Sequence, residues 1–257
     1  AVFDERARRL AARFWPGPLT LVLPVAPTGR VCELARAGLS TVALRMPGHP
    51  VALQLIRTFG RPVAAPSANR SGRISPTTAA HVREELGDRV SLILDGGPCA
   101  VGIESTIVDC SGGEPLVLRP GHISPAHLEA VFGRRLRILT AAGAPRVSGS
   151  LAAHYAPQTP MRLVAGERLL DFLNAQRHKG DRCGVIAHSQ PPQAGMPHVW
   201  KLLAADPVGY AHDLYAALRE MDHAGVALIA VEALPETAEW AAVADRLRRA
   251  VTGSGGA

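Results

Sequence analysis

Residues 61–76, "RPVAAPSANRSGRISP", join an apolar stretch to a run of small polar residues. The apolar part predicts a strand, and Ser67 and Asn69 follow it two residues apart. The segment that starts at Ser75, "SPTTAAHVREELG", predicts a helix with Ser75 as its N-cap, a proline in the first turn and a glycine at its end. A strand that ends in polar residues before a helix is typical of α/β proteins, which bind ligands at such ends.

Alternating strands and helices are predicted on both sides of this stretch. Towards the N-terminus the pattern predicts a helix, two strands and a second helix, at 4–14, 19–25, 40–47 and 50–59. Towards the C-terminus it predicts three strands and a short helix, at 91–97, 104–110, 115–121 and 124–133. We therefore expect an α/β domain over residues 1–140.

A change in composition separates this region from a smaller one. Residues 141–160 are rich in Gly, Ala, Ser and Pro, which indicates a linker. After it, three strand-like segments with helical patterns between and after them predict a parallel sheet over residues 161–257. The sequence thus predicts a large α/β domain, a linker and a small C-terminal α/β domain.

Composition and charge limit the function classes. The net charge of +6 comes mostly from arginine, which favours phosphate-bearing partners such as nucleotides or nucleic acid. The longest apolar runs are far shorter than the roughly 20 residues of a membrane-spanning helix, so we expect no membrane partner. The N-terminus lacks the pattern of a secretory signal, which predicts a cytoplasmic protein. Neither the four cysteines nor the histidines have metal-ligand spacing, so no protein-built metal site is expected.

Polar or charged residues stand at the ends of several predicted strands of the first domain. Arg45 and Arg119 each follow an apolar run, and Ser105 precedes one, in addition to Ser67 and Asn69. An arginine at such a position can hold a carboxylate or phosphate, although each residue taken alone is more typical of an ordinary strand end that meets water. The sequence contains no Walker P-loop, no GxGxxG and no GxSxG nucleophile motif. This favours chemistry by positioning and charge neutralisation.

Several motifs in order resemble one family. "FWPGPLTLVLP", "TVALRMPGHP", "PVAAPSANRSGRISPTTA", "ILDGGPCAVGIESTIVD" and "VLRPGHIS" resemble the YrdC-like threonylcarbamoyl-AMP synthases, and "SGSLAAHYAPQTP" followed by a small α/β domain resembles their two-domain form. The resemblance implies a twisted α/β sheet domain with a concave, positively charged cavity. It implies a nucleotidyltransferase that condenses L-threonine, bicarbonate and ATP to threonylcarbamoyl-AMP and pyrophosphate. The product then goes to a separate tRNA threonylcarbamoyl transferase complex.

The resemblance also implies the site residues. Arg45 matches the family arginine on the threonine carboxylate, and Ala65 and Ser105 match further threonine contacts. The expected ATP contacts are Thr41, Ser67, Asn69, Ser75, Arg119 and, as part of a lid formed by the linker, Tyr155. Mg²⁺ is expected with ATP, because a cation usually accompanies phosphates from which pyrophosphate leaves.

The sequence departs from the family near its N-terminus. The family's Lys-x-Arg pair is not present, and the first lysine is Lys179. We therefore expect that an N-terminal segment is missing and that this chain is weakly active or inactive.

Other classes of function remain open from the residues alone. One is a double-stranded RNA or tRNA-binding module without catalysis, which would bind through arginine and phosphate with strong salt dependence. Weak RNA binding is expected in either case. Aromatic residues make up only 4% of the chain, which disfavours stacking on single-stranded bases. A third possibility is a regulatory role for residues 161–257 alone.

Overall fold

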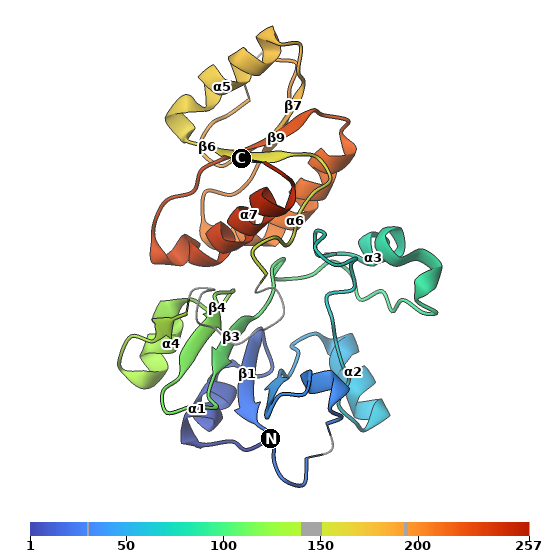
Figure 1. The fold of residues 1–257 in the computed structure, drawn as a ribbon, viewed down its shortest axis with the longest axis vertical. Helices are drawn as coiled ribbons and strands as arrows, with labels where there is room; N and C mark the ends of the chain where they lie inside the picture. Colours follow the sequence, from blue (N-terminus) through green and yellow to red (C-terminus); the bar gives the residue numbers. More distant parts are fainter. Residues whose placement is uncertain (30, 140–150, 193–194, 257) are drawn as a thin grey trace. The chain divides into compact units, whose positions relative to one another are not determined.

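The computed structural model describes residues 1–29, 31–139, 151–192 and 195–256. It contains two β-sheets (Figure 1), and contacts divide the chain into two compact units. The first unit comprises Ala1–Pro66 and Glu104–Ser150, and the second comprises Ser67–Ile103 and Leu151–Ala257. The second unit thus contains the stretch that begins at Ser67 together with the C-terminal sheet. The predicted domain boundaries stay a prediction, and residues 141–150 of the predicted linker lie outside the described residues.

A mixed five-stranded sheet forms the centre of the first unit, in the order β2-β1-β3-β4-β5. Its strands are β1 (Leu19–Pro24), β2 (Thr41–Leu44), β3 (Thr106–Asp109), β4 (Leu116–Arg119) and β5 (Arg137–Ile138). β1 is antiparallel to β2 and parallel to β3, while β3 is antiparallel to β4 and β4 is parallel to β5. This mixture of directions brings opposite ends of neighbouring strands to the same edge of the sheet.

The helices of the first unit begin and end at local sequence signals. They are α1 (Glu5–Phe14), α2 (Pro50–Phe59) and α4 (Pro125–Phe132), and a short 3₁₀ helix spans Leu34–Arg36. The predicted helix at 124–133 is confirmed: Ser124 is the N-cap, and Gly133 ends the helix with a φ of 69°. Leu10 of α1 and Leu128 of α4 are fully buried in one cluster with strand residues such as Leu21, so both helices cover the sheet.

An all-parallel four-stranded sheet forms the centre of the second unit, in the order β6-β9-β7-β8. Its strands are β6 (Met161–Val164), β7 (Cys183–Ala187), β8 (Val199–Leu202) and β9 (Leu228–Glu232). Its helices are α5 (Gly166–His178), α6 (Pro207–His223) and α7 (Ala241–Gly253), and a 3₁₀ helix spans Ala238–Trp240. Leu169 of α5 packs in one core cluster, whereas Leu214 of α6 and Leu247 of α7 pack in another, which places them on opposite faces of the sheet (Figure 1). The predicted small parallel sheet is confirmed.

Residues 67–103 differ from the sequence-based expectation. The segment contains α3 (Ala79–Leu86) and a 3₁₀ turn at Gly87–Arg89. The N-cap of α3 is Thr78, whose hydroxyl accepts a hydrogen bond from the His81 amide at 3.2 Å, so the expected cap at Ser75 is wrong. Ser75 is instead buried three residues ahead of that cap.

Two predicted strands do not form. Residues 62–66 and 91–97 are irregular, and within the described residues neither segment pairs with a strand. Leu92 and Leu94 are 75% and 53% exposed. Apolar composition alone cannot create a strand, because its backbone N–H and C=O groups need a partner strand.

Two further properties follow from the described residues. Burial raises the pKa of the Cys110 thiol to about 12 and that of the Cys183 thiol to about 11, and all four cysteines are free. In the described parts of the chain, no helix has the length and apolar character needed to cross a membrane.

Candidate functional site

Three of the predicted site residues lie at one edge of the first sheet, by which we mean the border formed by the ends of its strands. Arg45 directly follows β2, Ser105 directly precedes β3, and Arg119 ends β4. Because β2 is antiparallel to β1 and β4 is antiparallel to β3, these positions share the edge at which β1 and β3 begin. A hydrogen bond of 2.9 Å from the Gly17 amide to the Met46 carbonyl joins the segments next to β1 and β2 there.

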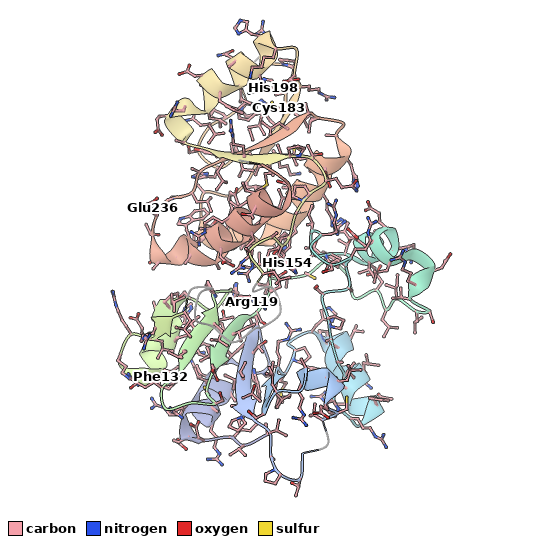
Figure 2. The ribbon with its side chains drawn as sticks, in the orientation of Figure 1. Arg119, Phe132, His154, Cys183, His198 and Glu236 are labelled. Atoms are coloured by element: carbon pink, nitrogen blue, oxygen red, sulfur yellow. The ribbon has the colours of Figure 1, made fainter. Side chains whose placement is uncertain are left out.

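Ser105 is held in a buried hydrogen-bond network at this edge. The Arg119 guanidinium, marked in Figure 2, donates from Nη2 to the Ser105 carbonyl at 2.9 Å and to its hydroxyl at 3.2 Å. The hydroxyls of Ser105 and Thr20 lie 2.7 Å apart. Ser105 and Arg119 are only 4% and 7% exposed. Thr20 was not predicted, because its place beside Ser105 follows from the pairing of β1 with β3 and not from a local sequence signal.

The backbone around Ser105 is packed closely against the segment after β4. The Thr106 hydroxyl donates to the Ile123 carbonyl at 3.0 Å and accepts from the Ile123 amide at 3.1 Å. A Cβ at Gly121 would lie 2.4 Å from the Thr106 nitrogen, so only glycine fits there. Ser105 is therefore presented by a rigid backbone.

Arg45, Ala65 and Thr41 of the first unit are not part of the buried network around Ser105. Arg45 and Ala65 are exposed, and Ala65 lies in the irregular segment after α2. Thr41 pairs with Pro24 at the opposite end of β2 from Arg45. Four residues of extended strand span about 13 Å, so the structure does not bring Thr41 to the edge that carries Arg45.

In the second unit, the loop that contains Ser67 and Asn69 has a constrained conformation. Ala68 between them has a φ of 56°, a left-handed conformation that few non-glycine residues adopt. The Asn69 Nδ2 donates to the carbonyls of Arg70 at 2.9 Å and of Arg73 at 3.0 Å. These two acceptors fix the orientation of the amide, so Oδ1 can only accept. Among the described residues, this buried oxygen accepts no hydrogen bond.

Tyr155 lies next to the same loop. The Ala156 amide donates to the Gly72 carbonyl at 2.9 Å. The Tyr155 ring is 1% exposed and packs against Tyr215, with ring centroids 5.6 Å apart. The end of the predicted linker is therefore packed into the core of the second unit beside the loop.

The predicted site residues thus form two sets, one in each unit. Arg45, Ser105 and Arg119 share an edge of the first sheet, whereas Ser67, Asn69, Ser75 and Tyr155 belong to the second unit. In the described parts of the chain, no group of three or more His, Cys, Asp or Glu residues has the arrangement of a metal site.

Comparisons with known proteins cover both units. A family model described as "Telomere recombination" matches residues 1–121, and one described as "Threonylcarbamoyl-AMP synthase, C-terminal domain" matches residues 123–252. A protein named threonylcarbamoyl-AMP synthase from Bacillus subtilis (strain 168) is 40% identical over 97% of this chain and 74% of its own length. One of the same name from Pyrococcus abyssi (strain GE5 / Orsay) is 38% identical over 96% of this chain and 74% of its own.

A solved structure resembles the fold over almost the whole chain. The crystal structure of Pyrococcus abyssi Sua5 in complex with L-threonine has a TM-score of 0.87 and is 36% identical in sequence. The match covers 99% of this chain and 76% of that one.

Proposed function

This chain belongs to the threonylcarbamoyl-AMP synthase family, and on that basis we propose that it condenses L-threonine, bicarbonate and ATP to threonylcarbamoyl-AMP and pyrophosphate. The observation that carries the proposal is the 40% identity over 97% of the chain. The alternative of an RNA-binding module without catalysis is not favoured, because the family match extends over both units.

We propose the first sheet's edge as the threonine site. The exposed guanidinium of Arg45 can pair with the threonine carboxylate through two parallel hydrogen bonds. The Ser105 hydroxyl, oriented by Thr20 and Arg119, supplies a fixed polar contact at the same edge. The role of Ala65 as a further threonine contact stays a prediction. The structure of the Pyrococcus abyssi relative with L-threonine supports this assignment at the level of the ligand.

We assign ATP to the predicted nucleotide contacts. Ser67, Asn69 and Ser75 come from the constrained loop of the second unit, and Tyr155 lies beside it. The role of Arg119 as an ATP contact stays a prediction; within the first unit its Nη2 and Nε donate to the Ser105 carbonyl and so order Ser105. The role of Thr41 as a further ATP contact stays a prediction. Catalysis by such groups consists of positioning the reactants and neutralising phosphate charge.

Mg²⁺ is proposed as the cation that accompanies ATP. Asn69 Oδ1 is a buried acceptor with no hydrogen bond from the described residues, and a neutral oxygen of this kind suits Mg²⁺. The cation would neutralise negative charge on the phosphates when bound. Asn69 itself keeps its amide nitrogen on two backbone carbonyls, which presents Oδ1 in a fixed direction.

The product determines the next step. Threonylcarbamoyl-AMP is a mixed anhydride that loses AMP to a nucleophile, so we propose that a separate tRNA threonylcarbamoyl transferase complex consumes it. We propose a cytoplasmic location, where ATP and tRNA are available. Weak RNA binding by the arginine-rich surface remains part of the proposal.

The test is pyrophosphate release from ATP and bicarbonate, measured with and without L-threonine. It is performed on this chain and on a chain preceded by a segment that carries the family's Lys-x-Arg pair. Threonine-dependent release from either sample supports the synthase assignment. Absence of threonine dependence in both, together with salt-sensitive RNA binding, would overturn it in favour of the RNA-binding module.

An Arg45→Lys variant tests the threonine site within the same assay. Lysine keeps the positive charge but cannot make the bidentate pair, so we expect the KM for threonine to rise about tenfold with the KM for ATP unchanged. Arg57→Lys on α2, also an exposed arginine, is the matched control.

A further inference from the structure

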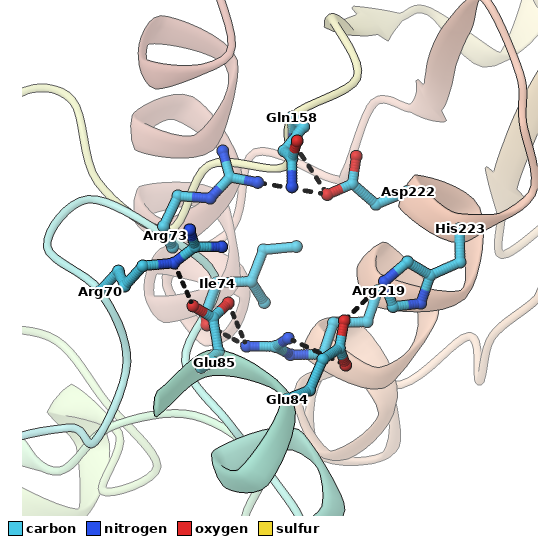
Figure 3. Close-up of a pocket in the computed structure, with 9 residues that line it drawn as sticks. All are labelled: Arg70, Arg73, Ile74, Glu84, Glu85, Gln158, Arg219, Asp222 and His223. Carbon is cyan, nitrogen blue, oxygen red and sulfur yellow. Dashed lines mark hydrogen bonds and ion pairs between the residues drawn. The ribbon is translucent and has the colours of Figure 1, made fainter. Parts of the chain in front are cut away.

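Helix α6 of the second unit contacts the loop that carries Ser67 and Asn69 through a cluster of charged residues. Figure 3 shows this α6 cluster, in which Arg219 and Asp222 on α6 meet Arg70, Arg73 and Glu85. All of these residues belong to the second unit. More than 130 positions of sequence separate the two sides, so only the tertiary fold brings them together.

Arg219 fixes the backbone next to Ser75. Its Nη2 donates to the Ile74 carbonyl at 2.6 Å and to Glu85 Oε1 at 3.1 Å. Glu85 also accepts from Arg70 Nε at 3.1 Å. Arg219 is 5% exposed, so these charge-assisted hydrogen bonds are largely shielded from solvent. One guanidinium thus ties α6 to both the loop and α3.

Asp222 connects the loop with the segment that follows Tyr155. Its carboxylate accepts from the amides of Gln158 at 2.9 Å and Thr159 at 2.7 Å, and it lies 3.5 Å from Arg73 Nη2. The Arg73 carbonyl in turn accepts from Asn69 Nδ2 at 3.0 Å. A continuous series of contacts therefore runs from α6 through Arg73 to Asn69.

A second loop also packs on α6. A Cβ at Gly102 would lie 2.3 Å from the His212 carbonyl oxygen and 2.4 Å from that of Ala211. Ile74 and Ile103 belong to the same apolar cluster as Leu218 of α6. The helix therefore supports residues 70–75 and 102–103 at once.

The α6 cluster is a structural support rather than a ligand pocket. The cavity between its side chains is about 30 Å³, which is room for one or two water molecules. Arginines and carboxylates are present in equal number among the six that line it, three of each, so no strong excess of charge attracts an anion.

We propose that α6 positions the nucleotide loop, which is the loop that contains Ser67 and Asn69. Arg219 and Asp222 are then positioning residues for ATP binding. This inference rests on the proposed function for its ligand, since the loop residues Ser67 and Asn69 are the proposed ATP contacts. Neither positioning residue is expected to touch the substrate. Helix α6 would thus set the affinity for ATP and leave the affinity for threonine unchanged.

The test compares Asp222→Asn and Arg73→Gln, singly and together, with Glu220→Gln as the control. Glu220 lies on the same helix but pairs with Lys201 at 2.6 Å, outside the cluster. The readouts are the Kd for ATP, the Kd for L-threonine, and hydrogen exchange of the amides between residues 67 and 77. Thermal unfolding establishes that each variant is folded. Arg219→Ala is avoided as the main variant, because it would leave the buried Glu85 carboxylate with Arg70, which is largely exposed, in place of its buried partner.

We expect each single variant to weaken ATP binding about five- to tenfold and to raise exchange in the loop. The double variant should bind ATP about as weakly as the weaker of the two single variants, because both substitutions break the contact between Arg73 and Asp222. Threonine binding and the control should not change.

Unchanged loop exchange in Asp222→Asn would overturn the positioning role, and so would an equal loss of threonine affinity. If the unsubstituted chain bound no ATP, the nucleotide assignment itself would fail. The exchange measurement would still decide whether α6 holds the loop.

Discussion

At the scale of single residues, the geometry shows how neighbouring groups orient two small polar side chains, Ser105 before β3 and Asn69 in an irregular loop. Ser105 is oriented from two sides, by a neighbouring hydroxyl on β1 and by a guanidinium on β4. Asn69 uses its amide nitrogen locally and leaves an oxygen as acceptor. In both cases the group that we propose as a ligand contact is preorganised by a partner that the ligand would not need to touch.

Replacing Thr20 by valine tests the orientation of Ser105. The change removes the 2.7 Å hydrogen bond with little change in shape and suits a β-strand. We expect the Kd for L-threonine to rise about three- to tenfold, in line with the loss of one hydrogen bond. Thr58→Val on the exposed side of α2 should leave it unchanged. An unchanged Kd in Thr20→Val would contradict a role for this bond.

The buried carboxyl of Glu232 should make the stability of the folded chain depend on pH. Burial alone raises the pKa of this carboxyl, but hydrogen bonds from Ser189 and His188 outweigh it and hold the pKa below the usual 4.5. A group whose pKa is lowered by folding stabilises the fold above its unfolded pKa, and this contribution is lost as the pH falls through the folded value. We expect Glu232→Gln to reduce the unfolding free energy by about 1–3 kcal/mol at pH 7.

The same variant should differ less from the unsubstituted chain at acid pH. Urea titrations at pH 7 and at steps below pH 4.5 measure the difference, which should shrink as the carboxyl becomes protonated. Glu236→Gln, at an exposed position shortly after β9, is the control. A difference that stays constant through the acid range would contradict the interpretation.

At the scale of elements, local sequence signals decide where helices begin and end, whereas distant partners decide whether a strand forms. The caps of α4 are contained in "SPAHLEAVFG", and the structure has them there. The segment 91–97 has a strand's composition but within the described residues has no partner strand. The N-cap of α3 is Thr78, because its hydroxyl accepts a hydrogen bond from the His81 amide. Helix caps are decided within a few residues, whereas a strand depends on a distant segment.

Gly102→Ala tests the packing of the segment around Gly102 on α6. The new Cβ would lie within 2.5 Å of three backbone atoms, and the φ of 84° is unfavourable for alanine. We expect a loss of about 2–3 kcal/mol of unfolding free energy, measured by urea titration. Gly97→Ala has the same positive φ in open space, so it should cost only about 1 kcal/mol. Equal losses would mean that packing on α6 contributes nothing.

At the scale of the whole molecule, residues 67–103 depend on the C-terminal part of the chain. Ile74 and Ile103 are buried in the core formed by α6 and α7. Residues 161–257 therefore also support the fold of residues 67–103, and a purely regulatory role for them does not explain this packing.

Truncation after residue 160 tests this dependence. Without α6, Ile74 loses its packing and its carbonyl loses the hydrogen bond from Arg219. We expect residues 67–103 to lose hydrogen-exchange protection and ATP binding to fall more than tenfold, while α1 and β1 of the first unit keep their protection. Retained protection of residues 67–103 in the truncated chain would contradict the prediction.

The sequence alone determined most helices and strands and predicted an α/β region followed by a small parallel sheet, because caps, apolar periods and short turns act over a few residues. Ordered motifs also determined the family and named Arg45, Ser105 and Arg119. Only the tertiary structure decided that Thr20 supports Ser105, that two strand-like segments find no partner strand among the described residues, and that α6 contacts the segment next to Ser75. These features depend on contacts between residues far apart in the chain, which no local pattern encodes.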